Sequence, residues 1–341
     1  MCRPVYGAAP THLVAAPGGI VAHRPVGGPH IRLRRVTPTD LAALIRAAAT
    51  DVLTGRGLGT DALPVEIDIA RPRNPAHGDY ATSVALRTAK RLGVAPRQLA
   101  GWLVDDLGGR AGIATAEVAG PGFVNVRLAA VERGALVDAV LAAGPRYGET
   151  TESDALTALT QAGPATRIRT TAGTMITMAE LVGAVGEPAA RYALARTGSA
   201  ALDTDLDVLA APTERNPAHR VRFAHARLCA LARHAADLGI TPGRHYELLD
   251  HPTEGELIRT LGEYPDVVRA AAQRGEPPRV ARYLETMSTA YDRCDDTCRV
   301  LPLGDEPITE LHRARLALAS ATRQVLANGL DLVGVSAPER M

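Results

Sequence analysis

Three side chains suited to RNA recognition recur along one stretch of the sequence, NPAHRVRFAHARLCALARH, at residues 216–234. Arg220, Phe223 and Arg227 are spaced by three and four residues, so a helix would place them on one face. A guanidinium can bond phosphates or base edges, and an aromatic ring can stack on an unpaired base. The pattern indicates a surface for a polyanion, and the solvated face of an ordinary surface helix is the open alternative.

The same stretch carries the local signals of a helix. Asn216 is a favourable N-cap, and Pro217 is tolerated in the first turn because its missing N–H would be unpaired there. His225 and Cys229 fall at the edge of the predicted apolar stripe, and we interpret both as packing residues. That stripe comprises Val221, Ala224, Leu228, Leu231 and Ala232.

Two other groups of residues have the spacing of metal ligands but lack a full site. The first group has the spacing of calcium-loop ligands but has Val208 where the sharp turn needs glycine. Its members are Asp203, Asp205, Asp207 and Glu214. The second group is Cys294 and Cys298, which have no histidine at ligand spacing. We predict no metal and no cofactor, and the chain has no glycine-rich P-loop or dinucleotide fingerprint.

Length and composition bound the architecture. The chain has 341 residues, enough for two modest domains, and is 46% hydrophobic but only 3% aromatic. Its core must therefore come mainly from Ala, Leu and Val, which favours close-packed helices. A net charge of +1 means that any nucleic-acid surface must be local. No apolar run is long enough to span a bilayer, and the scattered cysteines predict no disulfide framework, so we expect a cytoplasmic protein.

The first half of the chain mixes helical and strand periodicities. Residues 1–36 are rich in Pro and Gly, and we expect a disordered arm. Strands are predicted at residues 65–69 and 123–128 from alternating or continuous apolar residues. Helices are predicted at residues 37–54, 80–93, 95–107 and 131–143. Strands separated by helices over this length predict a small α+β domain.

The second half is predicted to be all-helical. Residues 149–166 have mixed signals and are taken as a linker. Beyond them, stretches striped with Ala, Leu and Val indicate a helical bundle. The predicted helices, besides the one at residues 216–234, are 187–196, 253–261, 264–273, 278–293 and 310–328.

Two segments of the first half resemble a known family. NPAHGDYATSVAL and VAGPGFVNVRL are similar to the signature segments of the N-terminal additional domain of arginyl-tRNA synthetases. In that family the domain grips the tRNA elbow around the D-loop, through an Asn-Pro-x-x-Gly turn. The resemblance implies that Asn74, His77 and Asp79 contact tRNA. The open alternative is a turn that only caps a helix, since Asn and Asp are good turn and cap residues.

The second half resembles the DALR anticodon-binding domain of the same family. RFAHARLCAL, CRVL and the closing VLANGLDLVGVSAPERM carry the likeness. The resemblance implies that Arg220, Phe223, Arg227 and Met341 hold the anticodon loop. Asp295 stands where the family commonly has a tyrosine, and an acid beside RNA is electrostatically unfavourable.

The family's catalytic centre has no counterpart in the sequence. Residues 167–186 resemble the K-M-S-K-R segment, but Thr170 falls on its second lysine, and a hydroxyl cannot neutralise developing phosphate charge as a cation does. The H-x-G-H segment, whose histidines stabilise phosphates during adenylate formation, does not occur. We therefore expect an additional-like domain at residues 37–148 joined through the linker to a DALR domain at residues 167–341, and no enzyme activity.

These observations predict a non-catalytic tRNA-binding protein, regulatory or tRNA-delivering, that contacts the elbow and the anticodon loop. An arginine tRNA is the first candidate ligand, and neither DNA nor membrane is expected as a partner. Two alternatives remain open. The chain could be the tRNA-recognition subunit of a separate aminoacylating or aminoacyl-transferring protein, or a retained fold used as a protein-interaction scaffold.

Overall fold

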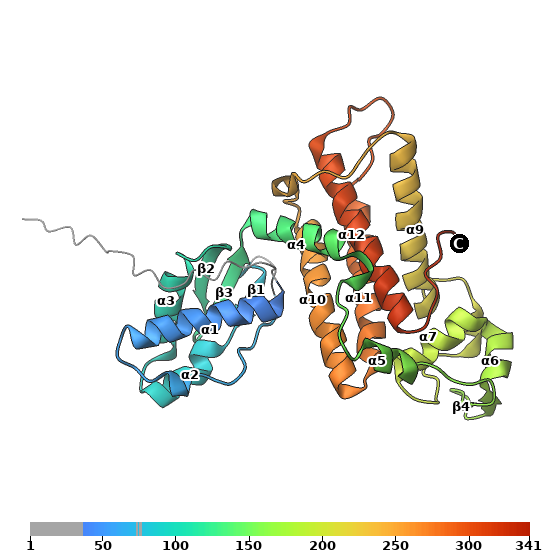
Figure 1. Cartoon of the computed structure of the whole chain (residues 1–341), viewed down its shortest axis with the longest axis horizontal. Helices are drawn as coiled ribbons and strands as arrows, with labels where there is room; N and C mark the ends of the chain where they lie inside the picture. Colours follow the sequence, from blue (N-terminus) through green and yellow to red (C-terminus); the bar gives the residue numbers. More distant parts are fainter. Residues whose placement is uncertain (1–36, 73, 75–76) are drawn as a thin grey trace, which may run out of the picture. The chain divides into compact units, whose positions relative to one another are not determined.

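The computed structural model describes residues 37–72, 74 and 77–341 (Figure 1). The predicted N-terminal arm, with its arginines at positions 32, 34 and 35, lies outside the described residues.

The first part of the described chain combines a small sheet with three helices. Strands β1 (Tyr80–Thr82), β3 (Phe123–Leu128) and β2 (Ile113–Ala119) form an antiparallel sheet in the order β1-β3-β2. The sheet shares a core with three helices, α1 (Pro38–Thr54), α2 (Val84–Leu92) and α3 (Pro96–Leu107). A short 3-10 helix, η1, spans Thr60–Ala62. The shared core includes Leu41, Leu44, Ile45, Leu53, Val84, Leu99, Leu103, Val124 and Val126. The α+β prediction for this part is confirmed.

Strand β1 is held in register by pairing with β3. Tyr80 lies opposite Val126, and Thr82 lies opposite Val124. Just before β1, Gly78 has φ +118°, and a Cβ there would lie 2.8 Å from the Val126 carbonyl oxygen. Only glycine fits this conformation and this close approach, which explains the glycine of the Asn-Pro-x-x-Gly turn.

Two predictions for this part were wrong. Residues 65–69 form no strand, because Val65 is 94% exposed and the segment ends in a single bridge from Ala70 to Ala81. Alternation of apolar residues indicates a strand only where a neighbouring strand is available for pairing. The helix predicted to begin at residue 80 begins at Val84, because residues 80–82 pair with β3 instead.

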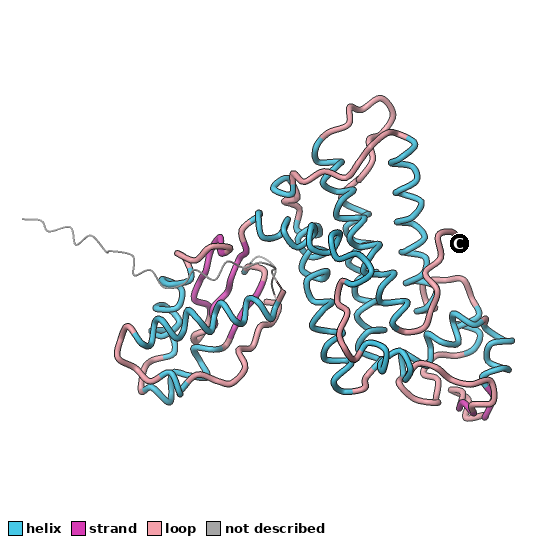
Figure 2. Tube along the Cα trace, in the orientation of Figure 1, coloured by secondary structure: helices cyan, strands magenta, loops and turns pink. Residues whose placement is uncertain are grey.

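The remaining chain is predominantly helical, as predicted (Figure 2). Its large core joins side chains of α4 (Ala130–Ala143), α5 (Ser153–Leu159) and α7 (Glu187–Thr197) to those of the four long helices. The long helices are α9 (Pro217–Asp237), α10 (Pro252–Arg274), α11 (Pro277–Thr297) and α12 (Glu310–Leu332). The short 3-10 helices η3 (Gly144–Arg146) and η4 (Tyr246–Leu248) lie in the connections.

A smaller cluster packs beside α7. Hairpin strands β4 (Arg167–Arg169) and β5 (Met175–Thr177) lead into α6 (Met178–Val185), and α8 (Leu206–Ala210) follows α7. Its core comprises Ile168, Met178, Leu181, Ala190, Ala193, Leu194, Leu202 and Leu209. Residues 167–186, which resemble the K-M-S-K-R segment, therefore form a hairpin and the whole of α6.

The two helices predicted at residues 253–261 and 264–273 are one helix, α10, which contains Pro265. Proline cannot donate to the carbonyl four residues earlier, and this normally breaks a helix. Here the carbonyl oxygen of Leu261 accepts a hydrogen bond from the Tyr147 hydroxyl at 3.1 Å, and that of Thr260 accepts one from Tyr283 at 2.8 Å. Two tyrosines remote in sequence thus satisfy the carbonyls around the proline.

The domain boundaries at residues 148 and 166 stay predictions. Within the predicted first domain, α4 contributes Leu136, Val137 and Val140 to the core of the helical part. Within the predicted linker, α5 contributes Leu156, which is 1% exposed.

Candidate nucleic-acid interface

Helix α9 starts at a capped and buried residue. The Asn216 side-chain oxygen accepts hydrogen bonds from the backbone N–H groups of Ala218 at 3.1 Å and His219 at 3.2 Å. The side-chain nitrogen donates to the carbonyls of Leu209 at 2.6 Å and Ala211 at 3.1 Å. Asn216 therefore caps α9 and joins it to the end of α8, which fixes the direction in which the helix projects its side chains.

An aromatic ridge runs along the exposed side of α9. His219 and Phe223, four residues apart, stack with ring centroids 5.6 Å apart and an angle of 12° between their planes. The Arg227 guanidinium lies one turn further, 5.9 Å from the centroid of the Phe223 ring. Phe223 is 43% exposed, although a phenylalanine normally packs inside. The ridge, defined as His219, Phe223 and Arg227, thus offers flat surfaces to an unpaired base.

Helix α11 supplies polar and acidic partners to Arg220 and Arg227. Arg227 donates to Asp292 at 3.1 Å and also to Asp295. Arg220 donates to the Thr289 hydroxyl at 2.7 Å, and its nearest approach to an Asp292 oxygen is 3.8 Å. Arg220 and Arg227 are therefore half-buried and bonded to groups within the protein, rather than projecting freely into solvent.

The electrostatic environment of this contact is mixed. Burial raises the pKa of Asp292, with Glu214 and Asp296 adding to the effect while Arg227 and Arg220 oppose it. Burial acts to lower the pKa of Arg227, but Tyr291 and the two aspartates outweigh it, so the net shift is upward. Arg227 remains charged, and its guanidinium also lies 5.3 Å from the Tyr291 ring centroid.

The other flank of α9 holds the last residues of the sequence. Arg222 donates to the Ser336 carbonyl at 3.2 Å, and Arg233 donates to the Glu339 carbonyl at 3.2 Å. Between them, the His225 ring nitrogen Nδ1 lies 2.9 Å from the Pro338 carbonyl. These contacts lay residues 336–339 along the helix and leave Met341 54% exposed. As expected, His225 and Cys229 are buried packing residues.

The elbow-side candidates separate into two environments. Asn74 and His77 are exposed, and the His77 N–H donates to the Asn74 carbonyl at 3.0 Å. Asp79 is only 2% exposed. One of its carboxylate oxygens accepts from the Leu128 N–H at 2.8 Å, and the other accepts from Arg259 at 2.8 Å. The turn thus presents Asn74 and His77 at the surface, while Asp79 bonds inside the protein.

The residue that matches the second lysine of the K-M-S-K-R segment is buried in a hairpin loop. Thr170 is 6% exposed, and its hydroxyl lies 2.7 Å from that of Thr174 across the hairpin loop. Its N–H donates to the Thr174 carbonyl at 2.9 Å. Thr170 therefore stabilises the turn.

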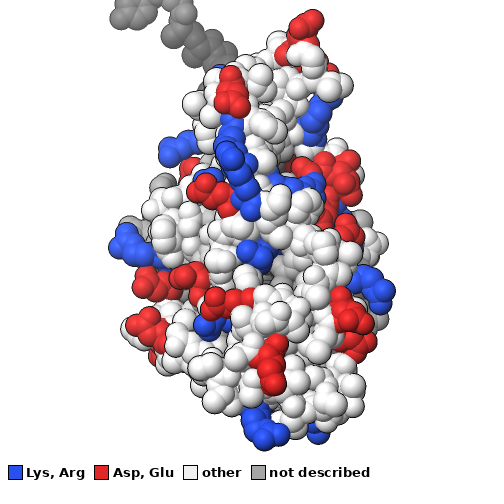
Figure 3. Space-filling view, turned by 90° about the vertical axis from the view of Figure 1, so that its right-hand side faces the viewer, with Lys and Arg blue, Asp and Glu red and all other residues white. Residues whose placement is uncertain are grey.

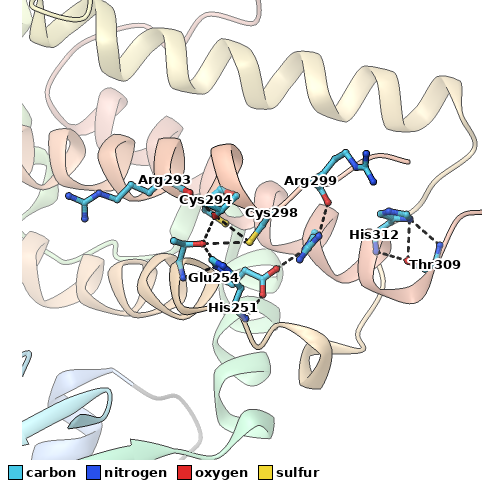
Figure 4. A network of polar contacts seen from close by, with 11 residues as sticks. His251, Glu254, Arg293, Cys294, Cys298, Arg299, Thr309 and His312 are labelled. Atoms are coloured by element: carbon cyan, nitrogen blue, oxygen red, sulfur yellow. Dashed lines mark hydrogen bonds and ion pairs between the residues drawn. The ribbon is translucent and has the colours of Figure 1, made fainter. Parts of the chain in front are cut away.

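Cys294 of α11 and Cys298, the residue that follows this helix, belong to a buried polar network (Figure 4). Cys298 Sγ lies 3.5 Å from the Thr253 hydroxyl. The neighbouring Glu254 is fully buried and accepts from Arg315 at 2.7 Å and from the His251 N–H at 3.0 Å. Burial raises the pKa of Cys294, with Cys298 adding to the shift. The thiol therefore stays protonated and packs at the start of α10, which does not favour a thiolate metal ligand.

The described part of the chain holds neither a metal-ligand cluster nor a membrane-spanning helix. No group of three or more His, Cys, Asp or Glu residues within it is arranged to hold a metal ion. None of its helices is long and apolar enough to span a membrane. Acidic and basic side chains are interspersed over the face shown in Figure 3. This face therefore carries no broad positive field of the kind that attracts a polyanion over a distance.

The fold is that of a small α+β domain followed by a helical bundle, and comparisons identify both parts. A family model described as "Arginyl tRNA synthetase N terminal domain" matches residues 39–128, and one described as "DALR anticodon binding domain" matches residues 221–341. The chain belongs to the arginyl-tRNA synthetase-related proteins, and these two matches are to the N-terminal and anticodon-binding domains of that family.

Solved structures share the fold at low sequence identity. An arginyl-tRNA synthetase of Thermus thermophilus is 13% identical with a TM-score of 0.58, over 88% of this chain and 100% of that one. An arginyl-tRNA synthetase of Plasmodium falciparum is 8% identical with a TM-score of 0.60, over 88% of this chain and 99% of that one. These two similarities establish the fold.

Sequence reasoning missed the partners of the ridge. It identified Arg220, Phe223 and Arg227 on one face, but it did not predict that Asp292 and Asp295 reach them from α11. The spacing of these acids by three residues, three and six positions after Thr289, was the available signal, since such residues share one helix face.

Proposed function

We propose that this protein is a non-catalytic tRNA-binding factor that holds an anticodon loop on α9. The proposal rests on the exposed ridge of His219, Phe223 and Arg227. Phe223 and Arg227 lie within the residues matched by the anticodon-binding model, and His219 lies two residues before them. A half-exposed phenylalanine between a histidine ring and a guanidinium has the flat, apolar and cationic surfaces that unpaired bases favour. Met341, exposed beyond the tail segment bound along α9, would close the other side of the loop.

A second contact at the tRNA elbow would come from the turn before β1. Asn74 offers an amide that donates and accepts to a base edge, and His77 offers a ring. Asp79 would support the turn from inside through its bonds to Leu128 and Arg259. Two separated contacts on one tRNA would raise affinity beyond either alone.

The absence of synthetase activity is part of the same proposal. The sequence has no H-x-G-H segment, and Thr170 is closed into a hairpin turn where a lysine would meet ATP phosphates. We expect no arginine-dependent exchange of pyrophosphate into ATP in the presence of tRNA. Exchange above background, in a preparation free of host synthetase, would contradict this part of the proposal.

The binding test uses the full chain and electrophoretic mobility shift of an arginine tRNA. Duplex DNA of equal nucleotide number serves as the matched polyanion. We expect a saturable shift with tRNA that excess duplex DNA does not abolish. Equal competition by DNA, or no shift at all, would overturn the proposal. If the shift is specific for tRNA, in-cell crosslinking and sequencing of the bound RNA would identify which tRNA the protein holds.

One observation favours a second candidate, a protein-interaction scaffold. Arg220 and Arg227 already bond to residues of α11, namely Thr289, Asp292 and Asp295. Their positive charges are therefore less available to RNA phosphates. An RNA-free purified protein that retains a stoichiometric protein partner would favour this function. A partner that forms aminoacyl adenylates or transfers aminoacyl groups would favour a tRNA-recognition subunit instead.

A further inference from the structure

The arginines of the proposed anticodon site are not available as ordinary phosphate-binding groups. Both outer nitrogens of Arg227 face carboxylates, one at 3.1 Å from Asp292 and the other in contact with Asp295. All three side chains are about one-third exposed, so water and RNA can reach them. A phosphate that approached Arg227 would meet two negative charges beside it.

We propose that Asp292 and Asp295 are specificity-determining residues that hold Arg227 flat beside Phe223 and exclude phosphates from it. The proposal rests on the proposed function, because it concerns how the same ridge selects RNA. The restrained guanidinium lies 5.9 Å from the centroid of the Phe223 ring and 5.3 Å from that of the Tyr291 ring. In this position it extends the stacking surface and does not act as a free cation.

Local charge supports selection by base rather than by backbone. The charges that interact here are two positive ones, on Arg220 and Arg227, and four negative ones. The negative charges are on Asp292, Asp295, Asp296 and Glu214. This surface disfavours phosphate. A carboxylate accepts hydrogen bonds, so it favours base edges that carry an exocyclic amino group. Cytosine, adenine and guanine carry such a group and would be accepted ahead of uracil, whose single N3–H lies between two carbonyl oxygens that a carboxylate repels.

Asp292 and Asp295 would therefore lower the affinity for RNA and raise the selectivity among RNA loops. Unfavourable contacts with the wrong ligand are a general source of specificity. Removing the negative charges should release Arg227 and Arg220 to bind phosphates, so that binding becomes tighter, less selective and more dependent on salt. A purely structural role for the aspartates predicts the opposite, a loss of both stability and affinity.

The test compares Asp292→Asn, Asp295→Asn and the double variant with wild type in the full chain. Binding of an arginine tRNA is measured by fluorescence anisotropy over a salt series. Asp51→Asn is the matched control, because Asp51 also pairs with an arginine, Arg110, but is on α1. We expect the double variant to bind roughly tenfold tighter, as one freed charge-assisted contact would allow. Its log–log salt slope should steepen by about 0.7 for each phosphate gained.

Base selection is read with anticodon stem-loops that differ at single loop positions. Wild type should discriminate against uracil at one or more positions, and the double variant should lose that discrimination. Folded variants with wild-type affinity, slope and selectivity would overturn the inference and leave tRNA binding standing. A wild-type protein and variants that all fail to bind tRNA would overturn both. Binding by the variants alone would support the phosphate exclusion and overturn tRNA binding by the native chain.

Discussion

The two candidate RNA surfaces differ in what their polar side chains already contact. At the elbow turn, Asn74 and His77 are exposed and the acid of the motif, Asp79, is buried and bonded on both oxygens. On α9 the side chains of Arg220 and Arg227 bond to α11, and the exposed element beside them is the Phe223 ring. At both surfaces the ionised groups support the structure, while neutral and aromatic groups face outward. We infer that hydrogen bonding and stacking, more than charge, carry recognition.

Among the substitutions that test this comparison, the largest expected effect is the loss of stability on replacing Asp79. Its ion pair with Arg259 is buried, with side-chain exposures of 3% and 13%. Replacing Asp79 by Asn leaves a buried guanidinium without its countercharge, which should cost about 3–5 kcal/mol of unfolding free energy. Chemical denaturation measures this. If Asp79→Asn kept full stability and lost tRNA affinity, Asp79 would be a direct RNA contact, and the division between supporting ionised groups and outward neutral groups would be wrong.

The next effect is at the cap of α9. Asn216→Ala removes the cap and the two bonds donated to Leu209 and Ala211. We expect a loss of about 2 kcal/mol in unfolding free energy, at the upper end for a cap because the residue is buried. Asn216→Asp retains the acceptor and separates the two contributions: it should restore the cap but not the donated bonds. Equal stability of wild type and Asn216→Ala in denaturant titrations would refute the role of this cap.

At the elbow, Asn74→Ala should reduce tRNA affinity by about 1–3 kcal/mol, the range for one base-edge contact, with little change in stability. A tRNA binding titration beside a thermal melt distinguishes the two functions of the turn. A fall in melting temperature with unchanged affinity would assign Asn74 to the turn alone and leave only His77 as an elbow contact.

The smallest expected effect is a pH dependence centred on His225. Burial lowers its pKa, and Arg323 adds to the shift, while the bond to the Pro338 carbonyl and the charge of Glu339 oppose it. Below an unfolded pKa of about 6.5, the unfolded chain binds a proton that the folded chain resists. The free energy of unfolding should therefore fall as pH drops through this range.

The control for this prediction is His225→Gln, which should flatten the decline between pH 7 and 5. Part of the slope should persist, because burial also lowers the pKa of His219 and of His312. A variant as steep as wild type would show that the decline arises at other groups.

Local signals were sufficient to predict α9 but not α10. A capping Asn, a first-turn Pro and regular apolar spacing specify α9 within its own residues. In α10 the same reasoning placed a break near Pro265, because the donor that replaces the missing proline N–H is the Tyr147 hydroxyl, more than a hundred residues away. Sequence alone could not anticipate this tertiary compensation for a local breaker. The strand predicted at residues 65–69 failed for the related reason that no partner strand lies beside it.

The candidate site shows the same limit. Helical periodicity placed Phe223 on an exposed face, and the structure agrees. The partners of Arg220 and Arg227 lie 65–69 residues further along the chain, so their pairing depends on how α9 and α11 pack. Charge counted along one helix therefore overstated how basic that face is.

The central claim is that the exposed ring on α9 stacks on an RNA loop base, and the protein contains its own control for this claim. Its two phenylalanines, Phe223 and Phe123, are 43% and 41% exposed, and Phe123 lies on β3. The measurement is binding of an arginine tRNA anticodon stem-loop to Phe223→Ala and Phe123→Ala. We predict that Phe223→Ala loses about 1–3 kcal/mol of affinity, the worth of one base–aromatic stack, while Phe123→Ala binds as wild type. Equal affinities for wild type and both folded variants would contradict the account.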